Sequence, residues 1–102
     1  MADTIAVRCV RLTYTHGLHM RPASLLSTEA QRFPCDIRIS CGDRQADAKS
    51  IWSLFSLMAE CGSELLIEAH GLKSQLAVER LHRLVTQDFR VSEEFNHALN
   101  DI

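Results

Sequence analysis

The segment YTHGLHMRPAS, residues 14–24, marks the point where a strand ends and a helix begins. Gly17 allows a tight turn, and Pro22 fits the first turn of a helix, where its missing N–H is not needed. Residues 6–13, ahead of the turn, interleave β-branched and apolar side chains with arginines and predict a strand. Beyond the turn, helical spacing over residues 20–33 is shown by Ala23, Leu26, Ala30 and Phe33. The segment therefore predicts a strand-turn-helix unit.

The remaining elements are indicated by alternation, turn residues and helical spacing. They are a strand over residues 35–41, a return strand over 44–48, a short helix after an N-cap at Ser50, a strand over 64–70 and a helix over 74–89. Two of the strands have one apolar and one charged face, which is typical of an antiparallel sheet covered by helices on one side only. The order β-α-β-β-α-β-α predicts an α+β open-faced sandwich with four antiparallel strands.

The C-terminal segment, residues 91–102, also shows helical spacing, at Val91, Phe95, Leu99 and Ile102. We expect an extra short amphipathic helix there. The chain of 102 residues fits one domain. The expected organisation is therefore a domain over residues 1–90, with residues 91–102 as an extension of the same domain.

The composition excludes several classes of protein. The formal net charge is −2, so no general basic field indicates binding to nucleic acid. No apolar run approaches the ~18 residues of a membrane span, and the start, MADTIAVR, lacks the basic region of a signal peptide. We expect a cytoplasmic protein without membrane insertion.

The four cysteines predict neither a disulfide nor a metal site. Cys35 and Cys41 face the same side of one predicted strand, about 20 Å apart at ~3.3 Å per residue, whereas a disulfide needs Cα atoms within about 7 Å. No C-x-x-C motif occurs, and the spacing of Cys and His does not match zinc sites. We expect reduced thiols, with no metal and no cofactor.

His19 falls at the predicted helix start, where chemistry with an anion is favoured. A helix N-terminus carries unpaired N–H groups and a partial positive charge, which bind anions and disfavour an imidazolium. A neutral imidazole is a nucleophile, and Arg21 can contact phosphate oxygens. His16 lies further from the helix end and is expected to flank a bound phosphate. On spacing alone the alternative stays open that His19 is a polar capping residue and Arg21 a solvated charge.

Two motifs resemble one known family. GLHMRPAS, residues 17–24, resembles the active-site signature of the HPr phosphocarrier family of the bacterial phosphoenolpyruvate-dependent phosphotransferase system: Gly, an aliphatic residue, His, a small residue, Arg, Pro and Ala. DAKSIWSLFSL, residues 47–57, resembles the Ala-Lys-Ser-Ile segment at the start of the family's second helix. The resemblance extends over residues 6–89 and implies the HPr-like β-α-β-β-α-β-α fold.

The resemblance implies a transient phosphohistidine rather than a free-standing catalyst. His19 would accept a phosphoryl group, on Nδ1 in the family, from phosphorylated enzyme I, and pass it to a IIA-type component in sugar uptake or its regulation. Arg21 would act beside it, and His16, Gly17 and Met20 would contact the phosphate. Met20 departs from the family's usual Ala or Thr.

Ser50 matches the serine that a dedicated kinase modifies in some HPr proteins, although an N-cap role explains a serine there equally well. An alternative is therefore an HPr-like regulatory binding module controlled by Ser50, without obligatory phosphotransfer. The docking surface for partners is expected to use Ser24, Ile51, Trp52 and Phe55, with Trp52 exposed. As a set, Ile51, Leu54, Leu57 and Met58 are expected to pack in the core. We expect a monomer.

Overall fold

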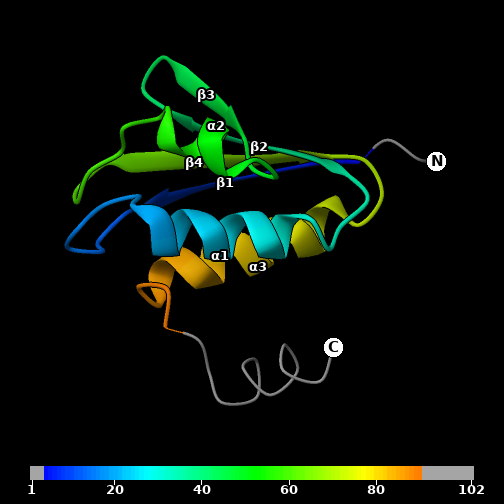
Figure 1. The fold of residues 1–102 in the computed structure, drawn as a ribbon. Coiled ribbons are helices and arrows are strands. Elements are labelled where there is room, and N and C mark those ends of the chain that lie inside the picture. The colour runs from blue at the N-terminus through cyan, green and yellow to red at the C-terminus, as the bar shows by residue number, and fades with distance from the viewer. Residues whose placement is uncertain (1–3, 91–102) are drawn as a thin grey trace.

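Four antiparallel strands form one sheet in the order β1-β4-β2-β3 (Figure 1). The computed structural model describes residues 4–90. Its elements are β1 (Ile5–Arg11), α1 (Met20–Ala30), β2 (Asp36–Cys41), β3 (Arg44–Asp47), α2 (Ile51–Phe55), β4 (Glu64–His70) and α3 (Ser74–Thr86). The predicted order and fold class are confirmed. The helix expected over residues 91–102 lies outside the described residues.

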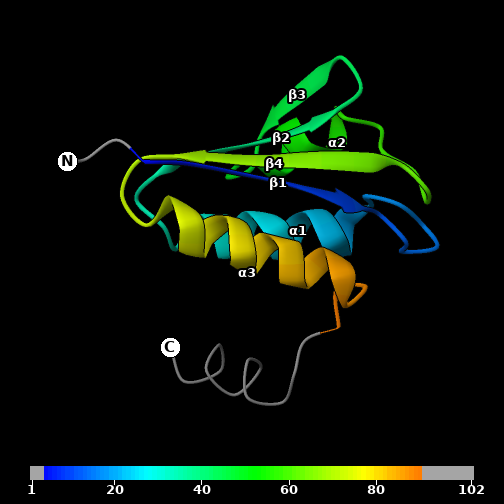
Figure 2. The ribbon, with the colours of Figure 1, turned by 180° about the vertical axis from the view of Figure 1, so that it is seen from behind.

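The helices α1 and α3 lie side by side across one face of the sheet, and the opposite face is uncovered within the described residues (Figures 1 and 2). The short α2 packs against α1 and β3. On the covered face, alternate strand residues meet the apolar stripes of the helices, at Val10, Ile37, Ile39, Leu65, Ile67, Ala23, Leu26, Ala77, Leu81 and Val85. Burying each larger aliphatic side chain contributes about 1.5–3 kcal/mol. The hydrophobic core therefore lies between the sheet and these two helices.

The uncovered face of the sheet carries the other half of the alternation. Arg11 of β1 and Glu64 of β4 are register partners and form an exposed ion pair at 3.6 Å, which stabilises the fold by at most about 1 kcal/mol. Ile5 and Val7 are exposed on the same strand. The predicted one-sided burial is therefore correct for this sheet.

The second helix is shorter than its spacing indicates, and one core prediction is wrong. Leu54 and Leu57 are buried and Ile51 is half-buried, but Met58 is 71% exposed. The helix α2 ends at Phe55, and Met58 has a φ of 54°, so the chain has left the helical path before Met58 can face the core. Helical spacing predicts burial only while the helix continues.

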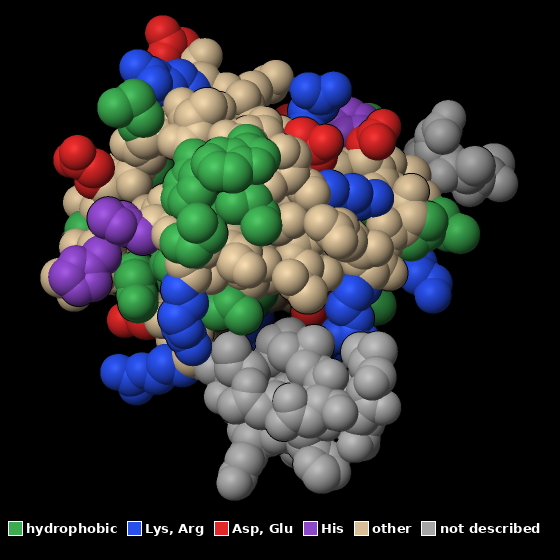
Figure 3. All heavy atoms as spheres, in the orientation of Figure 1, with side chains coloured by type: hydrophobic (Ala, Val, Ile, Leu, Met, Phe, Trp, Pro, Cys, Tyr) green, Lys and Arg blue, Asp and Glu red, His purple; other side chains and the backbone are tan. Residues whose placement is uncertain are grey.

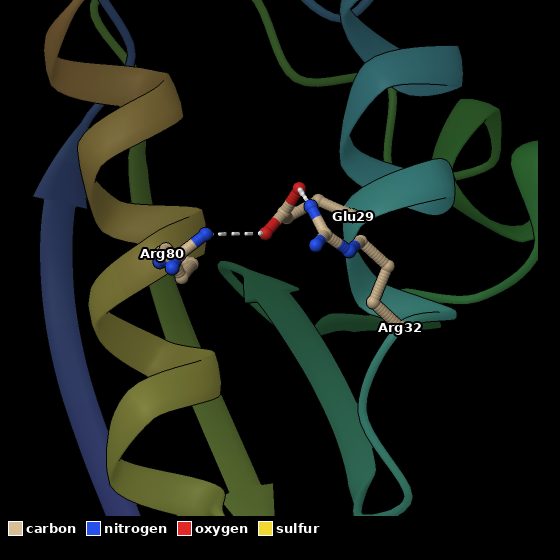
Figure 4. Close-up of polar contacts among 3 residues, drawn as sticks. All are labelled: Glu29, Arg32 and Arg80. Carbon is tan, nitrogen blue, oxygen red and sulfur yellow. Dashed lines mark hydrogen bonds and ion pairs between the residues drawn. The ribbon is translucent and has the colours of Figure 1, made fainter. Parts of the chain in front are cut away.

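A buried carboxylate joins the two covering helices. Glu29 of α1 has a side chain only 3% exposed, and its two oxygens face Arg32 at 3.5 Å and Arg80 of α3 at 3.4 Å (Figure 4). A buried charge is tolerated only where it is paired. Glu29 therefore ties α3 to α1 across the surface of the helical layer.

All four cysteines are free. Cys35 is buried, whereas Cys9 and Cys61 are exposed. No helix within residues 4–90 has both the length and the apolar character that a membrane span requires.

Candidate functional site

The loop between β1 and α1 is fixed by a close backbone contact. The N–H of Gly17 donates to the carbonyl of Tyr14 at 3.0 Å, and Leu18 donates to the carbonyl of Ala59 at 3.1 Å. Gly17 has a φ of 69°, and a Cβ at this position would lie 2.7 Å from the oxygen of Ala59. Only glycine fits both the left-handed backbone and this approach. The loop therefore seats the start of α1 against the segment that follows α2.

His19 is the N-cap residue of α1, with φ −83° and ψ −168°. Its carbonyl accepts a hydrogen bond from Ala23 at 3.0 Å, while its imidazole makes no capping hydrogen bond. The first-turn N–H groups of Met20 and Arg21 have no acceptor among residues 4–90, and Pro22 has no N–H. The alternative that His19 is a capping residue is thus correct for its backbone position, but its side chain makes no capping hydrogen bond. Two free donors and a free imidazole lie together at the helix end.

The guanidinium of Arg21 forms a hydrogen bond with a residue that is distant in the sequence. Its Nη1 donates to the carbonyl of Phe89 at 3.1 Å. Phe89 follows α3, is fully buried and has a φ of 60°, and the preceding Asp88 accepts a hydrogen bond from the hydroxyl of Thr13. A guanidinium has five N–H donors, and within residues 4–90 this contact uses one of them. Arg21 is therefore an oriented cation at the start of α1 and is not a freely solvated charge.

A row of aromatic rings places the second histidine beside the first. Tyr14 packs edge-on against Phe89 with ring centroids 5.5 Å apart, and His16 packs edge-on against Tyr14 at 6.0 Å. The rings of His16 and His19 are 6.1 Å apart at an interplanar angle of 66°. Figure 3 shows histidine side chains together at the surface over the loop between β1 and α1. His16 is thus a close neighbour of His19.

An apolar patch lies on α2, which packs against α1. Trp52 is 75% exposed and contacts Phe55 with ring centroids 5.8 Å apart, and Ile51 is half-buried beside it in the helix. We call these three residues the α2 patch. In Figure 3 apolar side chains form a broad area over α2, next to the histidines. Ser24 is half-buried on α1. An exposed aromatic of this kind is typical of a protein-binding surface.

Ser50 is the N-cap of α2. Its Oγ accepts a hydrogen bond from the N–H of Ser53 at 3.2 Å, and its own N–H donates to Asp47 at 3.0 Å. The capping role predicted for Ser50 is confirmed.

The residues that hold the site in place could not be predicted from the sequence. Tyr14 and Phe89 form the aromatic row, and the carbonyls of Ala59 and Phe89 hold the loop and Arg21. Two of these contacts are made by backbone atoms, which any residue supplies, and they join segments far apart in the chain. Among residues 4–90 no three His, Cys, Asp or Glu side chains are grouped so as to hold a metal ion.

Comparison with known proteins identifies the family. A family model described as the PTS HPr component phosphorylation site matches residues 6–87. The chain belongs to the HPr phosphocarrier family. HPr of Buchnera aphidicola subsp. Baizongia pistaciae is 39% identical over 79 residues, which are 78% of this chain and 93% of that protein. The crystal structure of HPr from Bacillus anthracis str. Ames has a TM-score of 0.76 at 34% identity and covers 80% of this chain and 98% of that one.

A third relative is an HPr-like protein that is not named a phosphocarrier. Crh of Bacillus subtilis is an HPr-like catabolite repression protein, and its crystal structure is described as a domain-swapped dimer. That structure has a TM-score of 0.65 at 34% identity, covering 81% of this chain and 94% of that one. Family membership makes this chain an HPr phosphocarrier of the phosphotransferase system, whose partners are other proteins of that system. The monomer expected from the sequence stays a prediction.

Proposed function

We propose that His19 accepts a phosphoryl group from phosphorylated enzyme I and passes it to a IIA-type component, in sugar uptake or its regulation. The observation that carries this proposal is the free imidazole of the N-cap residue beside two first-turn N–H groups without acceptors. A nucleophile and a ready anion site are thereby brought together.

The transfer step exchanges one phosphorus–nitrogen bond for another. A ring nitrogen of His19 attacks with its lone pair, the donor's phosphorus–nitrogen bond breaks, and the donor nitrogen keeps the electron pair. The N–H groups of Met20 and Arg21 and the oriented guanidinium of Arg21 then face the phosphoryl oxygens. Hydrogen bonds to a charged group contribute about 1.5–3 kcal/mol each. Catalysis otherwise needs alignment, which the docked partner provides, so the protein is a carrier rather than a free-standing catalyst.

Partners dock, in this proposal, on the α2 patch together with Ser24 on the neighbouring α1. Trp52 supplies a large apolar side chain of the kind that dominates interfaces, and the apolar area over α2 lies next to the histidines in Figure 3, which brings a docked protein to His19. We place residues 1–90 in one phosphocarrier domain, with residues 91–102 as its extension, and expect a cytoplasmic monomer.

Ser50 is a proposed regulatory phosphorylation site for a serine kinase. A phosphate at a helix N-terminus is locally favourable, but here it adds negative charge next to the α2 patch, where it repels a phosphorylated donor. The similarity to Crh favours a second candidate function: a regulatory binding module controlled by Ser50, without obligatory phosphotransfer.

The deciding experiment is incubation with phosphoenolpyruvate and enzyme I from the same source. The wild-type protein should gain one phosphoryl group, labile in acid and stable in base. His19→Ala should gain none, whereas His70→Ala, which removes an exposed histidine on the sheet, should label fully. Circular dichroism establishes that both variants fold. Stoichiometric labelling of His19→Ala would sink the assignment, and a wild-type protein that is never labelled would favour the regulatory module.

A further inference from the structure

We propose that His16 is a second functional imidazole, which binds the phosphoryl group on His19 in its protonated form and thereby links the phosphorylation of this carrier to pH. The proposal rests on the proposed phosphorylation of His19. Its basis is the separation of 6.1 Å between the two ring centroids, at an interplanar angle of 66°.

The position of His16 is set by packing, although its ring is exposed. The buried ring of Phe89 packs against Tyr14, and Tyr14 packs edge-on against His16. The turn at Gly17, closed onto the carbonyl of Tyr14, joins the two histidines. The ring is therefore directed beside His19 while it stays exposed to solvent.

His16 has no anionic partner within the part of the chain that the structure describes. Among residues 4–90, no ion pair or hydrogen bond involves its ring. The carboxylate of Asp88 accepts a hydrogen bond from Thr13. Seven titratable or charged groups lie on the segments packed around the loop: Tyr14, His19, Arg21, Glu60, Cys61, Asp88 and Arg90. A phosphoryl group on His19 is therefore the anion best placed to pair with His16.

The two cations of the site differ in their response to pH. Arg21 stays charged at all physiological pH values, whereas a histidine gains and loses its charge between about pH 5 and 8. A phosphoryl dianion next to His16 favours the imidazolium, and the additional proton comes from solvent. The phosphorylated carrier then holds more protons than the free carrier, so lowering the pH favours phosphorylation.

The size of the effect follows from the linkage between the two equilibria. If the phosphoryl group binds the protonated form of His16 about tenfold more tightly than the neutral form, the phosphorylation equilibrium changes by up to about tenfold between high and low pH. Protonation of the phosphoryl group itself also depends on pH, but it occurs with or without His16. The contribution of His16 is therefore the difference between the wild type and His16→Gln, in which a neutral amide replaces the imidazole.

The test measures the fraction phosphorylated at equilibrium with enzyme I and fixed phosphoenolpyruvate and pyruvate, from about pH 6 to 8. For a tenfold preference, the ratio of the wild-type equilibrium constant to that of His16→Gln should rise about sixfold from pH 8 to pH 6. The same ratio for His70→Gln should stay constant. In parallel, proton NMR at fixed pH should show a larger fraction of protonated His16 in the phosphorylated form than in the free form of the wild type.

A ratio that does not vary with pH, together with an unchanged protonated fraction of His16, would overturn the inference while phosphorylation itself still occurs. A wild-type protein that takes up no phosphoryl group would overturn the proposed function and this inference together. The two failures are therefore distinguishable in one experiment.

Discussion

Replacing Gly17 with alanine tests whether the loop between β1 and α1 is held by contact as well as by backbone conformation. Two glycines have nearly the same φ, 69° at Gly17 and 64° at Gly42. A Cβ at Gly17 would lie 2.7 Å from the oxygen of Ala59 and 3.1 Å from the Cα of Glu60, whereas nothing lies within 4 Å of a Cβ at Gly42. Gly42→Ala is therefore a matched control, which introduces the strain of a left-handed alanine without a steric contact.

The expected magnitudes separate the two variants. A left-handed alanine costs about 1–2 kcal/mol, of which about 0.4–1 kcal/mol is offset by the lower entropy of the unfolded chain. Gly42→Ala should therefore lose about 1 kcal/mol of unfolding free energy. Gly17→Ala must also move backbone away from backbone, which adds about 1–3 kcal/mol. Its total loss should be about 2–4 kcal/mol.

Urea denaturation of both variants and the wild type measures these free energies. In thermal unfolding each kcal/mol corresponds to about 4–8 °C for a domain of this size. Because the shift of Gly17 also moves the start of α1, phosphorylation of Gly17→Ala should be slower, while Gly42→Ala should match the wild type. Equal losses of stability in the two variants would refute the argument from contact with Ala59.

Three further predictions concern other parts of the domain. Glu29→Gln should lower the unfolding free energy by about 1–3 kcal/mol, because two arginines lose a buried carboxylate; a loss within 0.5 kcal/mol in urea denaturation would contradict this. Ser50→Ala should lower the unfolding free energy by about 1 kcal/mol, because it removes the N-cap of α2. Ser50→Asp should keep the cap but slow the phosphorylation of His19 by enzyme I. Unchanged kinetics in Ser50→Asp would argue against charge repulsion at the α2 patch. Burial is the larger cause, and the charge of Arg8 the smaller one, of a lowered pKa of His82 relative to 6.5. The unfolded chain therefore binds a proton more readily than the folded chain, and the unfolding free energy should fall as the pH drops below about 6.5. In His82→Gln this fall should be shallower than in the wild type or in His70→Gln, and identical slopes would contradict the assignment.

Much of the fold was predictable because local signals agreed with one another. The turn at Gly17 and the cap at Ser50 each set the start of a helix, and alternation over residues 64–70 matches the buried and exposed sides of β4. The element order follows from these signals alone. Met58 was wrongly assigned to the core because spacing gives no sign that α2 ends at Phe55.

The candidate site was predictable as a motif but not as an arrangement. Histidine at a helix start and arginine two residues later are visible in the sequence. The contact of Arg21 with the carbonyl of Phe89 joins positions 68 residues apart. Because the acceptor is a backbone atom, which every residue has, the contact cannot be predicted from residue types. Glu29 looks like an ordinary helix-surface carboxylate until Arg80 is placed beside it by tertiary packing. The nearness of His16 to His19 likewise depends on the ring of Tyr14.

The direction of β1 decides where this protein can be labelled. The strand runs seven residues toward the loop that carries His19, at about 3.3 Å per residue, and Figure 1 shows its start at the opposite end of the sheet from that loop. A dye attached at Ile5 therefore lies about 20 Å from the loop. The described chain after α3, by contrast, reaches the contact between Phe89 and Arg21. A bulky label attached at Arg90, next to this contact, would crowd the surface on which a partner approaches the histidine, so labels belong at the start of the strand.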